Sequence, residues 1–294
     1  MNRRYQQLGE KWFPLLDNPE QEAMNLIPRI VEEGGTRPVW GVKTPENEIT
    51  VLAWPRECPV RAAVTVQGKP GGKINPVTVL PLLEGEPQDL TVEEVHPWDN
   101  GGTAYVGACR NEGATPLFFL TQFYFRDKDQ LTPGVRQTFL LSGMAYGVRR
   151  ALLDELTISE GPEYEKHAAE WLEKHPGASR LDVPQLKVDL RGQRILQPSQ
   201  VPGDYELRSP IDDVEEVTFD GKTVYILRIA LGMDTPNPFK LLLYVPQKIC
   251  KGGYVPKKGD EIDTVFWLQG RLIDWDDTGY QSAGAPEAEE TPEN

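Results

Sequence analysis

The stretch Val92-Glu93-Glu94-Val95 recurs 122 residues further along the chain as Val214-Glu215-Glu216-Val217. A run of turn-forming residues follows each copy, Asp99-Asn100-Gly101-Gly102 in the first case and Asp220-Gly221 in the second. Self-similarity at a fixed spacing is the sequence signature of a repeated structural unit. This stretch therefore predicts that the chain contains one short fold twice.

Further landmarks follow in the same order and at nearly the same spacing. They are Thr103-Ala104-Tyr105-Val106 with Thr223-Val224-Tyr225-Ile226, Pro116-Leu117-Phe118 with Pro238-Phe239-Lys240, Thr132-Pro133-Gly134 with Val255-Pro256, and Gly147 with Gly270. Chance matches would scatter in spacing, so we interpret the series as an internal duplication. The alternative is that both halves are rich in hairpins, which give short matches anywhere.

Each half contains a hairpin, a hydrophobic strand, a Pro/Gly turn and a long closing strand. From about residue 37 the pattern is one of short β-type runs between turn residues. The predicted fold is therefore mainly β with added helices (α+β), with two tandem related small antiparallel β barrels or sandwiches. A partly open, OB-like barrel is one option for each. The strands are expected at Ile49–Trp54, Ala62–Val66, Val77–Leu83, Thr103–Cys109, Leu117–Phe125, Arg136–Leu141, Val214–Phe219, Thr223–Ala230, Phe239–Val245 and Asp260–Ile273.

Helical patterns occur at the N-terminus and between the two halves. Apolar spacing and Pro/Gly boundaries predict helices at Pro19–Glu33, Tyr146–Leu156 and Pro162–His175, and more weakly at Tyr5–Leu16. No large apolar residue follows Tyr280, so the acidic C-terminus is expected to be disordered. The predicted organisation is a helical N-terminal segment (1–36), a first β domain (37–150), a helical spacer packed between the β domains (151–184), a second β domain (185–277) and a disordered acidic tail (278–294).

Charge and composition narrow the classes of partner. The chain has 45 acidic and 31 basic residues and a net charge of −14, which disfavours a general nucleic-acid binder and would suit a basic protein partner. The three cysteines form no disulfide pattern, which favours a reducing cytoplasm. The longest apolar run, Leu241–Val245, is too short to cross a membrane. We therefore expect a cytoplasmic protein without a membrane segment.

The long strand at 260–273 carries the main candidate for a binding site. One of its faces alternates as Ile262, Thr264, Phe266, Leu268 and Leu272 and is expected to enter the core, with a bend or bulge at Gly270. Tryptophan and arginine often anchor protein interfaces, so the opposite face is a candidate for macromolecule binding. The alternative is that this aromatic strip is buried against the first β domain or the spacer helix. Its members are Val265, Trp267, Gln269, Arg271, Ile273 and Trp275.

A second candidate is a group of lysines around Tyr254. Basic residues near an aromatic ring could follow a nucleic-acid backbone while the ring stacks on a base. The alternative is a solvated loop on an acidic protein. The lysines are Lys240, Lys248, Lys251, Lys257 and Lys258.

Motifs for catalysis or cofactor binding are absent from the sequence. Gly68–Lys73 lacks the spacing of a phosphate loop, His167 and His175 are too far apart for a metal site, and Cys109 has no feature that would activate its thiol. We therefore predict no cofactor, no metal and no catalytic residue, although paired carboxylates leave no local signature and the enzyme question stays open. The preferred function is a non-catalytic cytoplasmic interaction protein that binds another macromolecule, preferably a protein, through the aromatic strip. The alternatives are an OB-like module for single-stranded nucleic acid or oligosaccharide, and a carboxylate-dependent hydrolase.

Overall fold

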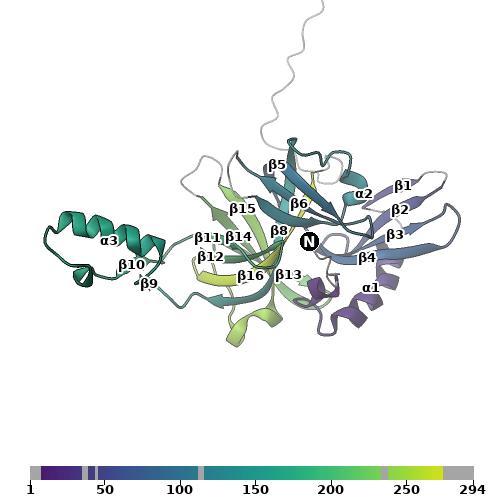
Figure 1. Ribbon diagram of the computed structural model, residues 1–294. Helices are drawn as coiled ribbons and strands as arrows, with labels where there is room; N and C mark the ends of the chain where they lie inside the picture. The colour runs from purple at the N-terminus through teal and green to yellow at the C-terminus, as the bar shows by residue number, and fades with distance from the viewer. Residues whose placement is uncertain (1–7, 35–38, 44–45, 112–115, 233–237, 274–294) are drawn as a thin grey trace, which may run out of the picture.

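The chain is mainly β in the computed structural model, which describes residues 8–34, 39–43, 46–111, 116–232 and 238–273. Its strands form a ten-stranded sheet, a four-stranded sheet and a two-stranded sheet. Figure 1 shows the ten-stranded sheet in the centre of the molecule, the four-stranded sheet on one side and a helical arm on the other. The predicted fold class is thus confirmed at the level of a mainly β protein with few helices.

The elements follow one another along the chain with short connections. The helices are η1 (Leu8–Trp12), α1 (Pro19–Gly34), α2 (Tyr124–Asp127), α3 (Pro162–Lys174), η2 (Arg180–Asp182), η3 (Gln247–Ile249) and η4 (Lys251–Gly253). The first eight strands are β1 (Trp40–Lys43), β2 (Glu48–Trp54), β3 (Val60–Gly68), β4 (Ile74–Leu83), β5 (Glu86–Pro97), β6 (Ala104–Cys109), β7 (Leu117–Thr121) and β8 (Arg136–Arg150). The others are β9 (Glu155–Ile158), β10 (Leu186–Asp189), β11 (Ile195–Pro198), β12 (Asp204–Pro210), β13 (Asp213–Phe219), β14 (Lys222–Leu231), β15 (Phe239–Pro246) and β16 (Glu261–Leu272).

The N-terminal part packs as a helix on a sheet. The spacing that predicted a helix at 19–33 is confirmed by α1, whose Leu26 and Ile30 are buried with apolar residues of β2 and β3. The helix ends at Gly34, where a Cβ atom would lie 2.9 Å from the carbonyl oxygen of Ala53. Glycine at this position therefore allows the helix end to lie directly on β2.

The two longest strands of the large sheet, β8 and β16, run antiparallel through its centre. β8 also pairs with β5, and β16 touches β7 in parallel, at Gln269 and Leu120. Because β5 pairs with β6 and β6 with β7, the strands β5, β6, β7, β16 and β8 close into a ring.

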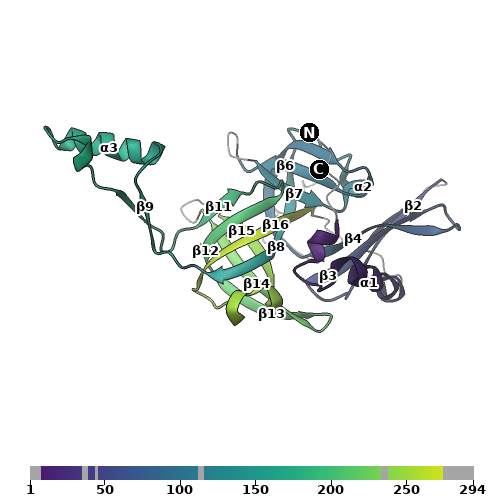
Figure 2. The ribbon, with the colours of Figure 1, turned by 60° about the horizontal axis from the view of Figure 1, so that its bottom comes forward.

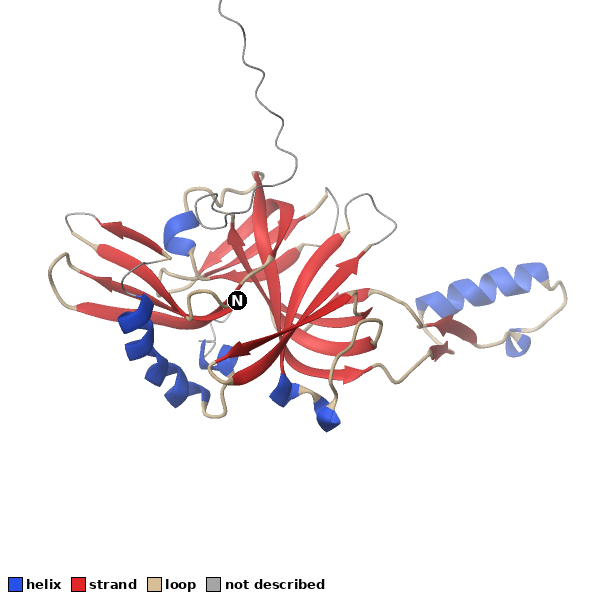
Figure 3. Cartoon of the chain, turned by 180° about the vertical axis from the view of Figure 1, so that it is seen from behind, coloured by secondary structure: helices blue, strands red, loops and turns tan. Residues whose placement is uncertain are grey.

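A second ring also contains the two central strands, β8 and β16, each of which has a different outer neighbour there. β12 pairs with β16, β8 pairs in parallel with β15, and β15 continues to β14 and β13. The chain bends from β12 into β13, as the single long strand β5 does between its contacts with β8 and β6. Figure 3 shows the strands of both rings crossing in the centre of the molecule.

The shared strands change the predicted domain boundaries. The expected division near residues 150–185 does not separate two sheets, because β8 pairs with β15 and β16 from the later half. In addition, β1–β4 form a separate sheet, although the sequence placed them with β5–β8 in one domain. The expected duplication stays a prediction, and the related order of strands in the two rings supports it.

Two local expectations for the centre of the sheet are wrong. Residues 146–150 of the expected helix Tyr146–Leu156 belong to β8, because pairing with β16 fixes them as a strand. The bulge expected at Gly270 lies instead at Tyr146, the extra residue of β8 between the partners of Val265 and Phe266. Gly270 has a packing role, since a Cβ atom there would lie 2.3 Å from the ring of Phe119.

Residues 151–194 form an arm instead of the spacer expected between two domains. α3 and the two-stranded sheet of β9 and β10 project away from the rings in two views (Figures 1 and 2). The prediction of a helix at 162–175 is confirmed by α3, but its buried Ala168 lies within the arm. The arm is therefore a small appendage between β8 and β11.

Candidate binding surfaces

The aromatic strip predicted on β16 is mostly internal. Trp267 is 1% exposed, and Gln269 and Arg271 are also buried. The Gln269 side chain accepts a hydrogen bond from Leu83 N at 3.0 Å and donates one to Pro81 O at 2.8 Å, so β4 covers this part of the strip. Of the two alternatives left by the sequence, the structure places these three side chains in a contact within the chain. Trp275 lies outside the described residues, as does the predicted acidic tail.

The N-terminal segment covers the strip with a buried positive charge. The Lys11 ammonium lies 5.2 Å from the ring centroid of Trp267 and donates a hydrogen bond to the Tyr146 hydroxyl at 2.7 Å. It also forms an ion pair with Asp204 at 3.3 Å. Burial lowers the pKa of Lys11 and raises that of Asp204, and each of the two charges partly offsets the shift of the other. The N-terminal segment is therefore held on β12 by a desolvated ion pair and on β16 by the contact with the Trp267 ring.

The predicted lysine cluster is dispersed by the fold. Lys248 donates to Leu16 O at 2.5 Å and pairs with Asp17, so it fastens the N-terminal segment. Tyr254 is half-buried and donates to Asp260 at 2.9 Å. Lys257 and Lys258 are exposed, Lys258 lying 4.0 Å from Asp213, and Lys251 lines a groove. Lys240, on β15, is exposed and its backbone carbonyl accepts a bond from Gln88.

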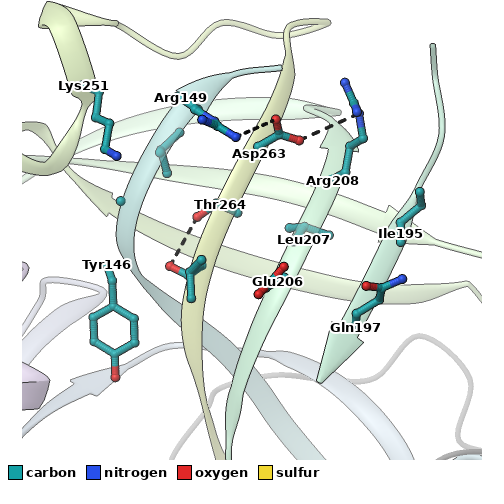
Figure 4. A pocket seen from close by; sticks show the side chains of 13 residues that line it. Tyr146, Arg149, Ile195, Gln197, Glu206, Leu207, Arg208, Lys251, Asp263 and Thr264 are labelled. Carbon is teal, nitrogen blue, oxygen red and sulfur yellow. Dashed lines mark hydrogen bonds and ion pairs between the residues drawn. The ribbon is translucent and has the colours of Figure 1, made fainter. Parts of the chain in front are cut away.

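The groove lies on the outer face of β8, β16, β12 and β11 and has a volume of about 600 Å³ (Figure 4). Its middle row, across the four strands, is Gly147, Val265, Glu206 and Gln197. Val265 is 40% exposed, and a Cβ atom on Gly147 would meet no atom within 4 Å. The open floor of the groove is thus the uncovered continuation of the aromatic strip.

The neighbouring row of the groove alternates in charge. Asp263 lies between Arg149 and Arg208, at 3.7 and 3.8 Å from their nitrogens. These distances are too long for hydrogen bonds, so the contacts are ion pairs only, and of the two arginines only Arg149 has a largely exposed side chain. With Lys251 at the rim, the groove has three cations against the two carboxylates Glu206 and Asp263, on a chain with a net charge of −14.

The arm presents an apolar side chain on an ordered turn. Leu181 is 96% exposed, and the turn that contains it is closed by a capping box. In this box the backbone N and the hydroxyl of Ser179 each donate to Asp182 at 2.8 Å. Leu152, Leu153 and Leu156, near the base, are exposed as well. The arm therefore carries one almost fully exposed leucine on an ordered turn and three more exposed leucines near its base.

The base of the arm is fixed to the rings. Gly192 N donates to the Glu261 side chain at 2.9 Å, and the guanidinium of Arg208 donates to Leu153 O. Arg194 pairs with Asp212 at 2.5 Å. These contacts hold the outgoing and the returning segment of the arm at the rim of the groove, so the arm leaves the body in a defined direction.

Side chains of the metal-binding types are not clustered in the part of the chain that the structure describes. It contains no group of three or more histidine, cysteine, aspartate and glutamate side chains that could hold a metal ion. Burial raises the pKa of Cys250 to about 11, and the pKa of Cys58 is also raised. In the groove, Asp263 lies between the guanidinium groups of Arg149 and Arg208.

No protein-family model, curated protein or solved structure matches the chain. None of its described helices is long and apolar enough to cross a membrane. The surfaces of this molecule are therefore interpreted from their own chemistry.

Sequence reasoning missed the groove and the arm for different reasons. The alternation in residues 260–273 placed Val265 on the face of Trp267, so one groove residue carried a signal. Arg149, Arg208 and Glu206 come from two other strands and meet only through pairing. Leu181 lies in a short turn without periodicity, so nothing in the local pattern marks it as exposed.

Proposed function

We propose that this protein is a non-catalytic interaction protein and that the arm of residues 151–194 is its main contact with a protein partner. One observation carries the proposal, the 96% exposure of Leu181 on a turn closed by its own hydrogen bonds. The backbone of this turn is already ordered, so binding through Leu181 requires little further ordering of the backbone, which favours association. Residues 160–182 around it contain six acidic and three basic residues, so the receiving surface should be apolar and cationic.

Excision of the arm tests the proposal. Leu190 N donates to Asp154 O at 2.8 Å, so the two ends of the excised segment already lie side by side. Residues 155–189 can be replaced by an Asn-Gly turn, which suits a two-residue hairpin. The excised protein should keep the thermal stability of the rings and lose the partner that the full chain captures from a nuclease-treated lysate.

Point variants locate the contact. Leu181→Asp should weaken capture at least tenfold, because the loss of a hot-spot side chain costs about 2 kcal/mol or more of binding free energy. Ile74→Asp is the matched control, since Ile74 is 51% exposed on the β3–β4 hairpin, outside the arm. Capture that persists in both the excised chain and Leu181→Asp would contradict the role of the arm.

A second candidate is the OB-like module predicted from the sequence. The five-strand ring order β5-β6-β7-β16-β8, with a parallel contact between β7 and β16, supports such a barrel, and OB folds bind ligands on strands 2 and 3. In the first ring these strands carry Tyr105 and Phe118, with Trp98 5.8 Å from Tyr105 and His96 beside Tyr105 in the register. The matching face of the second ring is covered, since Ile226 and Leu242 pack with the N-terminal segment.

The chemistry of the first face suits a sugar better than a phosphate backbone. Glu94 pairs with His96 at 2.8 Å, and no lysine or arginine takes part in this pair. Titration with neutral oligosaccharides and with single-stranded oligonucleotides, read by tryptophan fluorescence, tests the candidate. Binding that Trp98→Ala abolishes would support it, and a steep loss of affinity with salt would indicate nucleic acid. An unchanged signal with both ligand classes would overturn it.

A further inference from the structure

The groove beside the arm has the properties that the arm tip requires of its receiving surface. Its floor is open at Gly147 and Val265, beside Glu206 and Gln197, and its walls carry Arg149, Arg208 and Lys251 around Asp263. The outer arm, residues 160–182, has a net charge of −3, and the groove residues have a net charge of +1. An exposed leucine on a segment of net negative charge and a groove with an open apolar part and a net positive charge are complementary in both respects.

The arm does not fill the groove of its own molecule. Its base is fixed at the groove rim by the bonds from Arg208 to Leu153 O and from Gly192 N to Glu261. From there it projects away from the body in the views of Figures 1 and 2. The tip would have to break these base contacts and fold back to enter its own groove, whereas the tip of another molecule could enter directly.

We propose that the groove receives Leu181 and the acidic arm tip of a second copy of this chain, and that two copies exchange arms. Each copy has one tip and one groove, so a reciprocal exchange satisfies both contacts and closes a dimer with twofold symmetry. This proposal rests on the proposed function, because it names the partner of the arm.

Two variants test the proposal from its two sides. Leu181→Asp removes the anchor, and Gly147→Trp fills the groove in a place where a Cβ atom meets no neighbour. Sedimentation velocity over a concentration series should show a wild-type dimer, and each variant should raise the dissociation constant at least tenfold. Ile74→Asp should dimerise as the wild type does, and unchanged thermal melting in all three variants would show that they fold.

Disulfide trapping tests the contact directly. Leu181→Cys and Glu206→Cys, prepared separately and mixed under oxidising conditions, should form a cross-linked dimer, whereas a mixture of Ile74→Cys and Glu206→Cys should not. A weak specific contact has a dissociation constant of up to about 100 µM. A wild-type chain that stays monomeric at about this concentration would therefore overturn the exchange. A dimer that survives both Leu181→Asp and Gly147→Trp would do so as well. In either case, a different protein that the wild type captures and Leu181→Asp does not would still support the proposed function. The failure of the arm exchange can therefore be told apart from the failure of the proposed function.

Discussion

Lys11 shows at the scale of one residue how the N-terminal segment is joined to the sheet. Its ammonium is almost fully buried between the rings of Tyr146 and Trp267 and is balanced by Asp204. Removing one member of a buried ion pair leaves the other charge uncompensated, which costs about 3–5 kcal/mol. Lys11→Met should therefore lower the free energy of unfolding by about that amount, as measured by urea denaturation.

The double variant separates charge from packing. Lys11→Met combined with Asp204→Asn removes both charges and should recover a large part of the loss, because no unpaired ion is then buried. If the double variant is as unstable as the sum of the two single variants, the ion pair does not explain the contribution of Lys11 to stability.

Cys250 gives a prediction that depends on pH. Burial raises the pKa of its thiol from 9.0 to about 11, so at pH 8 the reactive thiolate is about 100-fold scarcer than at an ordinary cysteine. The raised pKa also means that the folded state holds this proton more tightly, so the contribution of Cys250 to stability should fall as the pH rises from 9 to 11. The rate of labelling with a thiol reagent, compared between native and unfolded protein at pH 8, checks the first statement. Equal rates in the two states would contradict it.

At the scale of elements, the glycines of the two central strands are not equivalent. Gly270→Ala would place a Cβ atom 2.3 Å from Phe119 and 2.7 Å from Leu141, so overpacking should destabilise the protein by about 1–3 kcal/mol. Gly147→Ala, on β8, should be neutral within about 0.5 kcal/mol, because a Cβ atom there meets nothing. Denaturation of the two variants side by side measures the difference. Equal midpoints would show that the close contact at Gly270 relaxes without cost.

At the scale of the whole molecule, the exchange of strands between the rings predicts joint unfolding. β16 closes the ring of the earlier strands, and β8 closes the ring of the later ones. Limited proteolysis should therefore cut the exposed arm within 177–194, while the two fragments stay together in gel filtration and unfold in one transition. Separation of the fragments without denaturant would contradict the interlocked arrangement and favour two independent domains.

Local patterns determined much of this fold in advance. The sequence predicted α1 and α3, the hairpin-rich β pattern and the inward face of β16, because short-range periodicity reports which side of an element is buried. It also predicted that the face of Trp267 makes a contact. These features depend on residues within one element and can be recognised without knowing its neighbours.

Tertiary structure alone decided which contact each face makes. The strip around Trp267 is covered by Lys11 from the start of the chain and by Pro81 on β4, and the groove joins residues of β8, β11, β12 and β16. Partners so distant in the sequence leave no periodic signal, because their proximity arises from the pairing of whole strands. The sequence by itself therefore determined a mainly β chain with a buried and a contact face on β16, while folding decided that the N-terminal segment and β4 cover that face at Trp267 and Gln269 and leave its end open as the groove.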